Sequence, residues 1–431
     1  MAKANGSKKY LVGVSGKKPL RVPITNVHAG NDYSATVLIG SQKARVNVIL
    51  DTGSSTFAVS PKVYDALKDS LVKPTTYAQV VEYGTGGWAG PLINTNLIIG
   101  DGKNNINLKR SHVAITSVQE QNNFVGVQGI LGLAFNGLNM AYDLKNALAK
   151  KASPYSHPWP YKAKDFKSFN QKFRQLMATH DIPEREVMPY FTELEEQGVI
   201  ANKFAFYTLR SRTHHATKDK SKAAGDPLNN GFFVIGGGEE QKDLYVGGLD
   251  AFLTAEVYHH KYYNTNLKSV QVEGCDAILA RPLQKKYISD SISNSIIDTG
   301  TNTLSLAKDV YNYIRKSFKK LNPGFIELIR ESDDQHAGLD ARKLNLAEWP
   351  KIHFTFSGDD RKDIKLTCTP DTYWQLNTPT NSRAVFQIGG PEDDQNQSVF
   401  GLPLLNNYYT IFDRSVHKHG VVRFAPIKRI K

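Results

Sequence analysis

Short apolar stretches separated by turn residues recur along most of the chain. Many of them are rich in β-branched and aromatic residues and are bounded by Gly, Asn or Asp, a pattern typical of β-strands. The clearest examples are residues 34–39, 44–50, 97–99, 232–235 and 352–356. This pattern predicts a mainly β protein.

Helical spacing of apolar residues is confined to a few segments. The predicted helices cover about 165–179, 189–197, 308–321 and 345–349. Residues 150–161 are rich in proline and aromatic side chains, and we interpret the segment around 150–183 as an irregular insertion in the first half of the chain.

One strand-and-loop pattern occurs twice. Residues 48–56, VILDTGSST, are matched by residues 295–303, SIIDTGTNT. In each half an apolar segment with a glycine follows, GILGLA at 129–134 and SVFGLP at 398–403. Such a repeat predicts two homologous β-barrel-like lobes with an active-site cleft between them.

The predicted division has three parts. Residues 1–21 form a basic N-terminal leader, 22–204 the N-terminal lobe and 205–431 the C-terminal lobe. A chain of 431 residues exceeds the size at which one hydrophobic core keeps growing, so two lobes agree with its length.

Charge alone suggests a different class of protein. The chain carries a formal net charge of +13, which by itself would fit a nucleic-acid-binding β protein. The basic residues are scattered, however, and their densest group, 210–222, is interpreted as an exposed loop. No nucleic-acid partner is expected, and the adjacent His214 and His215 lack cysteines at metal-ligand spacing, so no metal is expected.

Cysteine content and the N-terminal sequence bear on the compartment. Cys275 and Cys368 are the only cysteines, and they either form one disulfide or remain free. No apolar run approaches the length of about 20 residues that a membrane helix needs, so no membrane partner is expected. The first residues contain no signal-peptide-like stretch, which predicts a cytoplasmic protein, or a secreted or periplasmic one if a signal was removed.

Asp51 and Asp298 are the predicted catalytic residues, because each follows a buried apolar strand. A carboxylate in such a place is costly unless it is hydrogen-bonded or shares a proton. Two such groups facing each other hold one proton between them. The ionised member can then activate a water while the protonated member donates to a peptide carbonyl oxygen, without a metal or cofactor.

The residues after each aspartate have predicted supporting roles. The glycine amide can donate to the inner carboxyl oxygen, and the next hydroxyl can donate to the outer one. The two buried threonines can exchange hydrogen bonds and stiffen the site. These residues are Thr52, Gly53 and Ser54 in the first copy and Thr299, Gly300 and Thr301 in the second.

With these motifs the chain resembles the two-lobe, pepsin-like aspartic proteases, from about residue 24 to 426. Further matching segments occur in the family's order: the flap tip Tyr83, Gly84, Thr85 and Gly86, the segments 129–134 and 233–237, and the C-terminal strand at 408–413. The resemblance implies an aspartic endopeptidase with polypeptide substrates, no cofactor and inhibition by statine-type (pepstatin-like) compounds. It also implies substrate contacts at the flap, at Ile130 and at Asn302, with hydrophobic residues preferred around the scissile bond.

Three departures from the family pattern indicate which subgroup of the family the chain resembles. Ala58 stands where the family commonly has a Trp that holds the flap tyrosine, so we expect Tyr83 to be mobile or partnered by Trp88. The family's usual disulfides are missing, and only about twenty residues precede the first strand. Together these features resemble the bacterial pepsin homologues of the shewasin type. They predict activity without proteolytic maturation, a mildly acidic optimum and poor survival in strong acid.

The main alternative is a catalytically silent pepsin-fold protein that binds or inhibits. Such relatives usually lose an aspartate or disrupt a D-T-G segment, whereas both segments are intact here. The sequence therefore favours the enzyme. The physiological substrate, the subsite preferences and the oligomeric state are left open.

Overall fold

The computed structural model describes residues 18–83, 86–120, 126–149, 151, 153–334, 337–391 and 395–429, without the side chains of Tyr83 and Asp334. Internal contacts divide the chain into two units. The N-terminal unit comprises His28–Gly30 and Ser34–Val199; the C-terminal unit comprises the described residues of Met1–Val27, Asn31–Tyr33 and Ile200–Lys431. The division thus falls at 199/200, and the predicted boundary at 204/205 lies inside a strand of the C-terminal unit.

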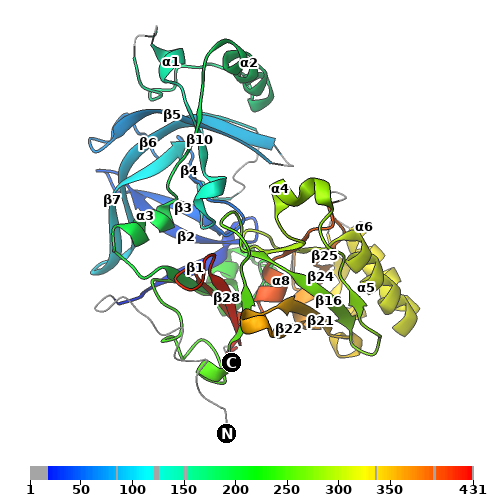
Figure 1. The fold of residues 1–431 in the computed structure, drawn as a ribbon. Helices are drawn as coiled ribbons and strands as arrows, with labels where there is room; N and C mark the ends of the chain where they lie inside the picture. Colours follow the sequence, from blue (N-terminus) through cyan, green and yellow to red (C-terminus); the bar gives the residue numbers. More distant parts are fainter. Residues whose placement is uncertain are drawn as a thin grey trace. The chain divides into compact units, whose positions relative to one another are not determined.

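The N-terminal unit is built mainly of strands (Figure 1). These are β2 (Asp32–Ile39), β3 (Ala44–Asp51), β4 (Phe57–Val59), β5 (Lys73–Tyr83), β6 (Gly86–Asp101), β7 (Asn104–Ile115), β8 (Val118–Gln119), β9 (Gly129–Gly132), β10 (Met140–Asp143) and β11 (Glu184–Glu186). Its helices are α1 (Lys145–Leu148), α2 (Phe166–Thr179) and α3 (Tyr190–Glu196).

The sheet of the N-terminal unit closes on itself. Neighbouring strands follow the order β6-β7-β4-β9-β3-β2, and β2 also pairs with β6 through Val37 and Ile99. A closed ring of strands leaves no free sheet edge and encloses a core, here filled by residues such as Val46, Val48 and Leu108 with no exposed surface. Strands β5, β10 and β11 extend this sheet beyond the ring.

The described residues of the C-terminal unit form four groups of paired strands. Its strands are β1 (Leu20–Ala29), β12 (Lys203–Tyr207), β13 (Asn230–Ile235), β14 (Leu253–Glu256), β15 (Asn264–Thr265), β16 (Leu267–Val272), β17 (Ile278–Leu279), β18 (Ser295–Ile297), β19 (Leu304–Ser305), β20 (Leu339–Asp340), β21 (Ile352–Ser357), β22 (Asp363–Cys368), β23 (Trp374–Leu376), β24 (Arg383–Phe386), β25 (Ile388–Gly389), β26 (Ser398–Phe400), β27 (Tyr408–Asp413) and β28 (Val421–Pro426). They pair in the orders β1-β13-β12-β27-β28-β14, β15-β18-β26-β19-β25, β17-β16-β21-β22 and β20-β24-β23. The mainly β, two-lobe fold class predicted from the sequence is confirmed.

The helices of the C-terminal unit are α4 (Ile288–Ser291), α5 (Lys308–Leu321), α6 (Pro323–Asp334), α7 (Pro370–Tyr373) and α8 (Leu402–Leu405). The two long ones, α5 and α6, lie side by side (Figure 1), and the residues of the short α8 are all buried. Helix α5 has the bounds predicted from the sequence and buries Val310, Ile314 and Phe318 along one face.

The structure also shows the state of the cysteines and the character of the helices. Cys275 and Cys368 are both free, which settles the alternative left open by the sequence. Among the described residues, no helix combines the length and apolar character required to cross a membrane.

Candidate active site

Asp51 is the last residue of β3 and opens the loop that leads to β4. Strand β3 runs parallel to β9, with Asp51 opposite Gly132. After the loop, the chain returns as β4 on the other side of β9, antiparallel to it. Strand β4 then pairs in parallel with β7, so four strands in the order β3-β9-β4-β7 hold the first D-T-G segment.

The second D-T-G segment is held in the same way. Strand β18 ends at Ile297, directly before Asp298, and runs parallel to β26. Strand β19 follows the loop and pairs antiparallel to β26, then parallel to β25. The order β18-β26-β19-β25 therefore repeats the order, and the parallel and antiparallel pairings, of β3-β9-β4-β7.

Both carboxylates accept the same local hydrogen bond. The Gly53 amide donates to Asp51 Oδ1 over 2.7 Å, and the Gly300 amide donates to Asp298 Oδ1 over 2.8 Å. Both aspartates are half-buried. A fixed donor on one oxygen orients each carboxyl group.

The threonine and serine residues of the two D-T-G segments differ in burial and in hydrogen bonding. Thr52 and Thr299 are buried, at 0% and 1% exposure, as predicted for residues that follow a core strand. Ser54 Oγ is buried without a hydrogen-bond partner among the described residues, so the predicted bond from Ser54 to Asp51 is not formed in this structure. Thr301 contributes its backbone oxygen, which accepts from the Leu402 amide over 2.9 Å.

The glycine of each apolar-Gly segment supports its D-T-G loop at close range. A β-carbon placed on Gly132 would lie 2.5 Å from backbone atoms of Ser55. One placed on Gly401 would lie 2.4 Å from the carbonyl oxygens of Thr301 and Thr303. Only glycine allows these loops to lie directly on the neighbouring strand. The sequence showed the recurrence of this motif but not its reason.

The predicted flap forms a hairpin of β5 and β6. Tyr83 is paired with Gly86, and Val81 with Trp88. Gly84, Thr85 and the Tyr83 side chain lie outside the described residues, so the prediction for the partner of the Tyr83 hydroxyl stays a prediction.

Trp88 and Ala58 occupy one core cluster. Both are fully buried, and they share the cluster with Leu92, Ala114 and Val187. The indole on β6 therefore packs among the same residues as the small side chain on β4. The indole of Trp88 thus lies in the core beside Ala58, and its predicted contact with the Tyr83 hydroxyl stays a prediction.

The two other predicted substrate-contact residues lie in the motifs described above. Ile130 is in β9 and is half-buried against the cluster that contains Ala58 and Trp88. Asn302 is half-buried in the loop between β18 and β19. Each thus lies in, or directly beside, the strand that supports a D-T-G loop.

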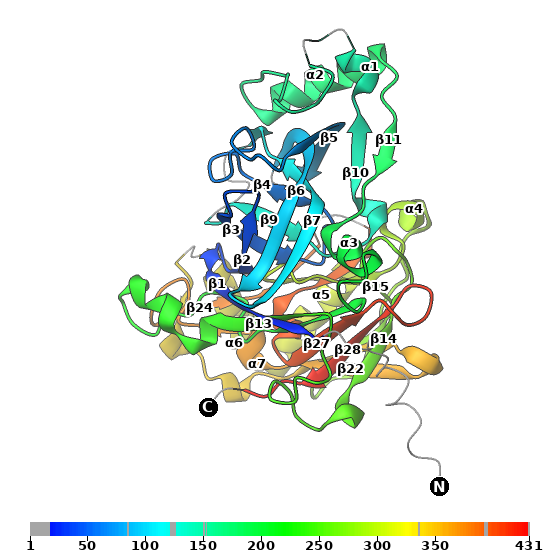
Figure 2. The same ribbon diagram turned by 90° about the vertical axis from the view of Figure 1, so that its left-hand side faces the viewer.

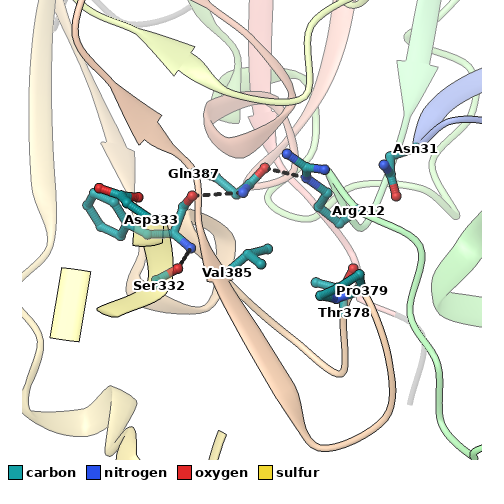
Figure 3. Close-up of a pocket in the computed structure, with 9 residues that line it drawn as sticks. Asn31, Arg212, Ser332, Asp333, Thr378, Pro379, Val385 and Gln387 are labelled. Atoms are coloured by element: carbon teal, nitrogen blue, oxygen red, sulfur yellow. Dashed lines mark hydrogen bonds between the residues drawn. The ribbon is translucent and has the colours of Figure 1, made fainter. Parts of the chain in front are cut away.

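A separate pocket of about 320 Å³ lies in the C-terminal unit and contains none of the predicted site residues. Figure 3 shows Arg212 at its wall, with Nε donating to Gln387 Oε1 over 2.8 Å. Gln387 is fixed in turn, because its Nε2 donates to the Phe386 carbonyl over 2.8 Å. Burial lowers the pKa of Arg212. These contacts form a local side-chain network that holds the pocket wall.

Metal-binding geometry is not found in the part of the chain that the structure describes. No group of three or more His, Cys, Asp or Glu side chains there is arranged to hold an ion.

Comparisons with known proteins agree with the repeated geometry. The family described as eukaryotic aspartyl protease matches residues 32–151 and 177–426. Pepsin-2B of Gadus morhua is 22% identical over 417 residues, covering 92% of this chain and 97% of that protein. Pepsin A of Gallus gallus is 23% identical, and the alignment covers 93% of this chain and 86% of that protein. The beta-secretase of Strongylocentrotus purpuratus is 22% identical, and the alignment covers 91% of this chain and 66% of that protein.

The chain belongs to the aspartyl protease family, because the family match spans most of its length. The match contains both D-T-G segments and leaves out residues 152–176. The omitted residues fall in the segment 150–183, which was predicted to be an irregular insertion. In the sequence, the helical spacing of Phe166, Phe169 and Phe173 is the signal that points to a role for this segment.

Proposed function

We propose that the protein is an aspartic endopeptidase in which Asp51 and Asp298 act as one catalytic pair. The observation that carries the proposal is the repeat of one four-strand arrangement around each aspartate. In both copies the glycine two residues on donates to the aspartate Oδ1. Two equivalent carboxylates, each oriented by a glycine amide, suit a site in which the pair shares one proton and activates a water.

The proposed mechanism uses the two protonation states together. The ionised aspartate takes a proton from a water molecule as that water attacks the carbonyl carbon of the peptide bond. The protonated aspartate donates a hydrogen bond to the carbonyl oxygen, where negative charge develops. Proton transfer to the leaving nitrogen then completes hydrolysis and returns the pair to one shared proton.

The substrate is an extended polypeptide with hydrophobic residues around the scissile bond. A peptide adjacent to the β5–β6 hairpin can form strand-like backbone hydrogen bonds, which bind many sequences with little selectivity. Selectivity then depends on side-chain contacts, for which Ile130 supplies an apolar surface and Asn302 a polar one. The free cysteines support the shewasin-type character inferred from the sequence and a reducing, cytoplasmic setting.

The decisive test replaces each aspartate by asparagine. Asp51→Asn and Asp298→Asn should each abolish nearly all cleavage of a denatured protein substrate. The double variant should be scarcely worse than either single one, because residues that act as a unit are non-additive. Asp363→Asn is the matched control: this carboxylate is paired with Lys268 on the surface, and its loss should leave turnover unchanged.

Inhibitor binding provides the second measurement. A statine-type compound, whose hydroxyl takes the position of the attacking water, should bind the wild type far more tightly than either variant. Substantial inhibitor-sensitive cleavage by either single variant would refute the pair. A wild-type protein that binds the inhibitor but cleaves nothing would instead favour the silent binding protein.

A further inference from the structure

The β5–β6 hairpin has two faces that pack against different parts of the N-terminal unit. Side chains alternate along a strand, so neighbouring residues point to opposite sides. Val81 and its partner Trp88 lie against the cluster that contains Ala58. Val80 and its partner Ala89 lie on the other face, where they contact the helical insertion.

The insertion covers this second face with a continuous apolar cluster. Helix α2 begins after Asp165, whose side chain accepts from the Ser168 amide in a capping box. Phe166, Phe169 and Phe173 follow on one face of the helix and are all nearly fully buried. They pack together with Ala78 of β5, Ala89 of β6, Val118 of β8 and Leu148 of α1. In Figures 1 and 2, α1 and α2 lie together beside the β5 side of this unit.

Phe166 contacts the hairpin at Gly87, one residue beyond the start of β6. A β-carbon on Gly87 would lie 2.3 Å from Phe166 Cε1 and 2.5 Å from Cζ. The aromatic ring therefore occupies the space that a side chain at position 87 would fill. Gly87 is paired with Glu82, so this contact lies one residue pair before the Tyr83–Gly86 pair at the end of the described hairpin.

Polar contacts from the same helix reach the same residue pair. Asn170 Nδ2 lies 3.5 Å from Glu82 Oε2, and Arg174 lies 4.0 Å from the same carboxylate. Both contacts are exposed and long, so they contribute little stability. They show that two turns of α2 lie close to Glu82, while Phe166 lies over the paired residue Gly87.

We propose that the insertion is a positioning element for substrate binding, and that Phe166 is its main contact. The proposal rests on the proposed peptidase function, in which the β5–β6 hairpin contacts substrate. Strand β6 pairs with β8 at Trp88 and Ala89, which holds one edge of the hairpin and leaves its two faces to be held by packing. Packing on both faces restricts movement of the hairpin relative to the rest of the unit. The contact between α2 and Gly87 restricts it close to the end that contacts substrate.

Loss of the Phe166 contact should therefore impair substrate binding without affecting the chemistry of the aspartates. In Phe166→Ala, kcat/KM for a peptide long enough to lie along the hairpin should fall about 10-fold or more, since small displacements of positioning groups have large effects. The loss should appear mainly as a higher KM, and the pH profile of kcat should keep its shape. Phe166→Leu, which retains an apolar side chain over Gly87, should recover most of the loss.

Phe173→Ala is the matched control. Phe173 is as buried as Phe166 and belongs to the same cluster, but its edge contacts Tyr142 of β10 over 5.0 Å between ring centroids. The two alanine variants should lose similar thermal stability, while only Phe166→Ala should lose kcat/KM. Equal kinetic effects in both variants, or none in either, would refute the positioning role.

Hydrogen exchange separates this proposal from the proposed function. Amides of residues 80–82 and 87–89 should exchange faster in Phe166→Ala than in Phe173→Ala, measured by mass spectrometry on the intact folded proteins. An inactive wild type would refute the peptidase function, and the exchange rates would still decide whether the insertion holds the hairpin. If Phe166→Ala does not fold, the milder Phe166→Val, which removes the ring from Gly87 but keeps an apolar side chain in the cluster, takes its place against wild type. Unchanged exchange and KM in Phe166→Val would refute the proposal.

Discussion

Two glycines that pack against the D-T-G loops tolerate no other residue type. Gly132 and Gly401 lie opposite or beside the D-T-G loops at distances that exclude any β-carbon. Because the atoms that a β-carbon would meet are backbone atoms, no side-chain rotation can relieve the clash. The loop itself must move, and the carboxylate moves with it.

Gly401→Ala should therefore reduce kcat by about 100-fold, as expected when a catalytic group is displaced by about 1 Å. The fold should persist, because the displaced loop is short and the surrounding sheet pairs remain. Steady-state kinetics and circular dichroism would measure the two effects. Gly225→Ala is the control, since a β-carbon there meets no atom within 4 Å. Normal kcat in a folded Gly401→Ala protein would contradict the role given to this glycine.

Asp69 is a second constrained residue, with a structural role in the N-terminal unit. It is buried and accepts hydrogen bonds from the Tyr64 hydroxyl over 2.5 Å and the Thr95 hydroxyl over 2.6 Å, as well as from the Ser41 and Leu71 amides. Burial by itself raises the pKa of Asp69, but these four donors outweigh it and lower the pKa to about 2. The charged carboxylate therefore stabilises the folded state.

Asp69→Asn should lower the free energy of unfolding by about 2 kcal/mol, because an amide cannot accept from all four donors. The folded pKa lies below that of the unfolded chain, near 3.8, so the contribution is present above that pH and is lost as the pH falls from about 3.8 towards about 2. Urea unfolding of both proteins at neutral pH and at about pH 3 would show a difference that shrinks in acid. A constant difference across this range would be inconsistent with the charged acceptor.

At the scale of elements, a small side chain on β4, Ala58, leaves room in the core for a large one on β6, Trp88, and this pairing of sizes explains how the hairpin is packed. Trp88 is fully buried in the cluster where Ala58 also has no exposed surface. The core space around position 58 is therefore already occupied by the indole from β6, which is separated from β4 by β7 in the sheet. A tryptophan at that position, as the family commonly has, is not compatible with this packing.

Ala58→Trp should accordingly destabilise the protein by about 1–3 kcal/mol or more through overpacking. Combining it with Trp88→Ala should restore part of the lost stability, since one indole would again occupy the cluster. Thermal unfolding of the two single variants and the double variant would measure the coupling. Additive losses would show that the two positions do not share one space.

Most regular elements could be predicted from the sequence, and one missed helix shows why others could not. Helix α5 was predicted with its observed bounds because Val310, Ile314 and Phe318 repeat at helical spacing. Helix α6 was missed because it begins with Pro323 and Gly324, which look like a turn. Proline is tolerated in the first turn of a helix, and the Asn322 side chain accepts from the Gly324 amide, so the helix forms.

The candidate site was predictable only where it is encoded in a repeated motif. Asp51 and Asp298 were found from two copies of D-T-G, and the hydrogen bonds from Gly53 and Gly300 follow from that local geometry. The contact of Phe166 with Gly87 joins residues far apart in the chain, and nothing in the spacing of either motif indicates it. Long-range packing of this kind depends on the fold and not on local pattern.

At the scale of the whole molecule, charge makes the protein sensitive to acid. The formal net charge is already +13 at pH 7 and rises further as carboxylates become protonated. A buried ion network in the C-terminal unit balances Lys203 and Arg423 against Glu239 and Asp413. Protonation of its carboxylates would leave buried positive charges without partners. Neither cysteine forms a disulfide to offset these effects.

Partly desolvated histidines add a loss of stability that begins at higher pH. Burial is the main cause of lowered pKa values at five imidazoles, those of His157, His215, His259, His353 and His419. His259 and His419 stack at 5.9 Å between ring centroids, and His260 packs edge-on against His419 at 4.3 Å. The ammonium group of Lys418 opposes protonation of both His259 and His419, and that of Lys261 opposes protonation of His259. These groups bind protons more readily in the unfolded chain, so the free energy of unfolding must decrease as the pH falls below about 6.5.

We therefore expect the melting temperature to fall between about pH 7 and pH 5, and folded structure to be lost well before the pH of strong acid. Added salt should raise the melting temperature more at about pH 5 than at pH 7, because it screens the repulsion among positive charges. The double variant His259→Gln/His419→Gln should have a shallower dependence on pH, since two groups that resist protonation are gone. His180→Gln, at the exposed end of α2, is the control and should keep the wild-type slope. Thermal unfolding followed by circular dichroism measures each slope, and a protein that stays folded and active after prolonged incubation near pH 2 would overturn this account of its acid sensitivity.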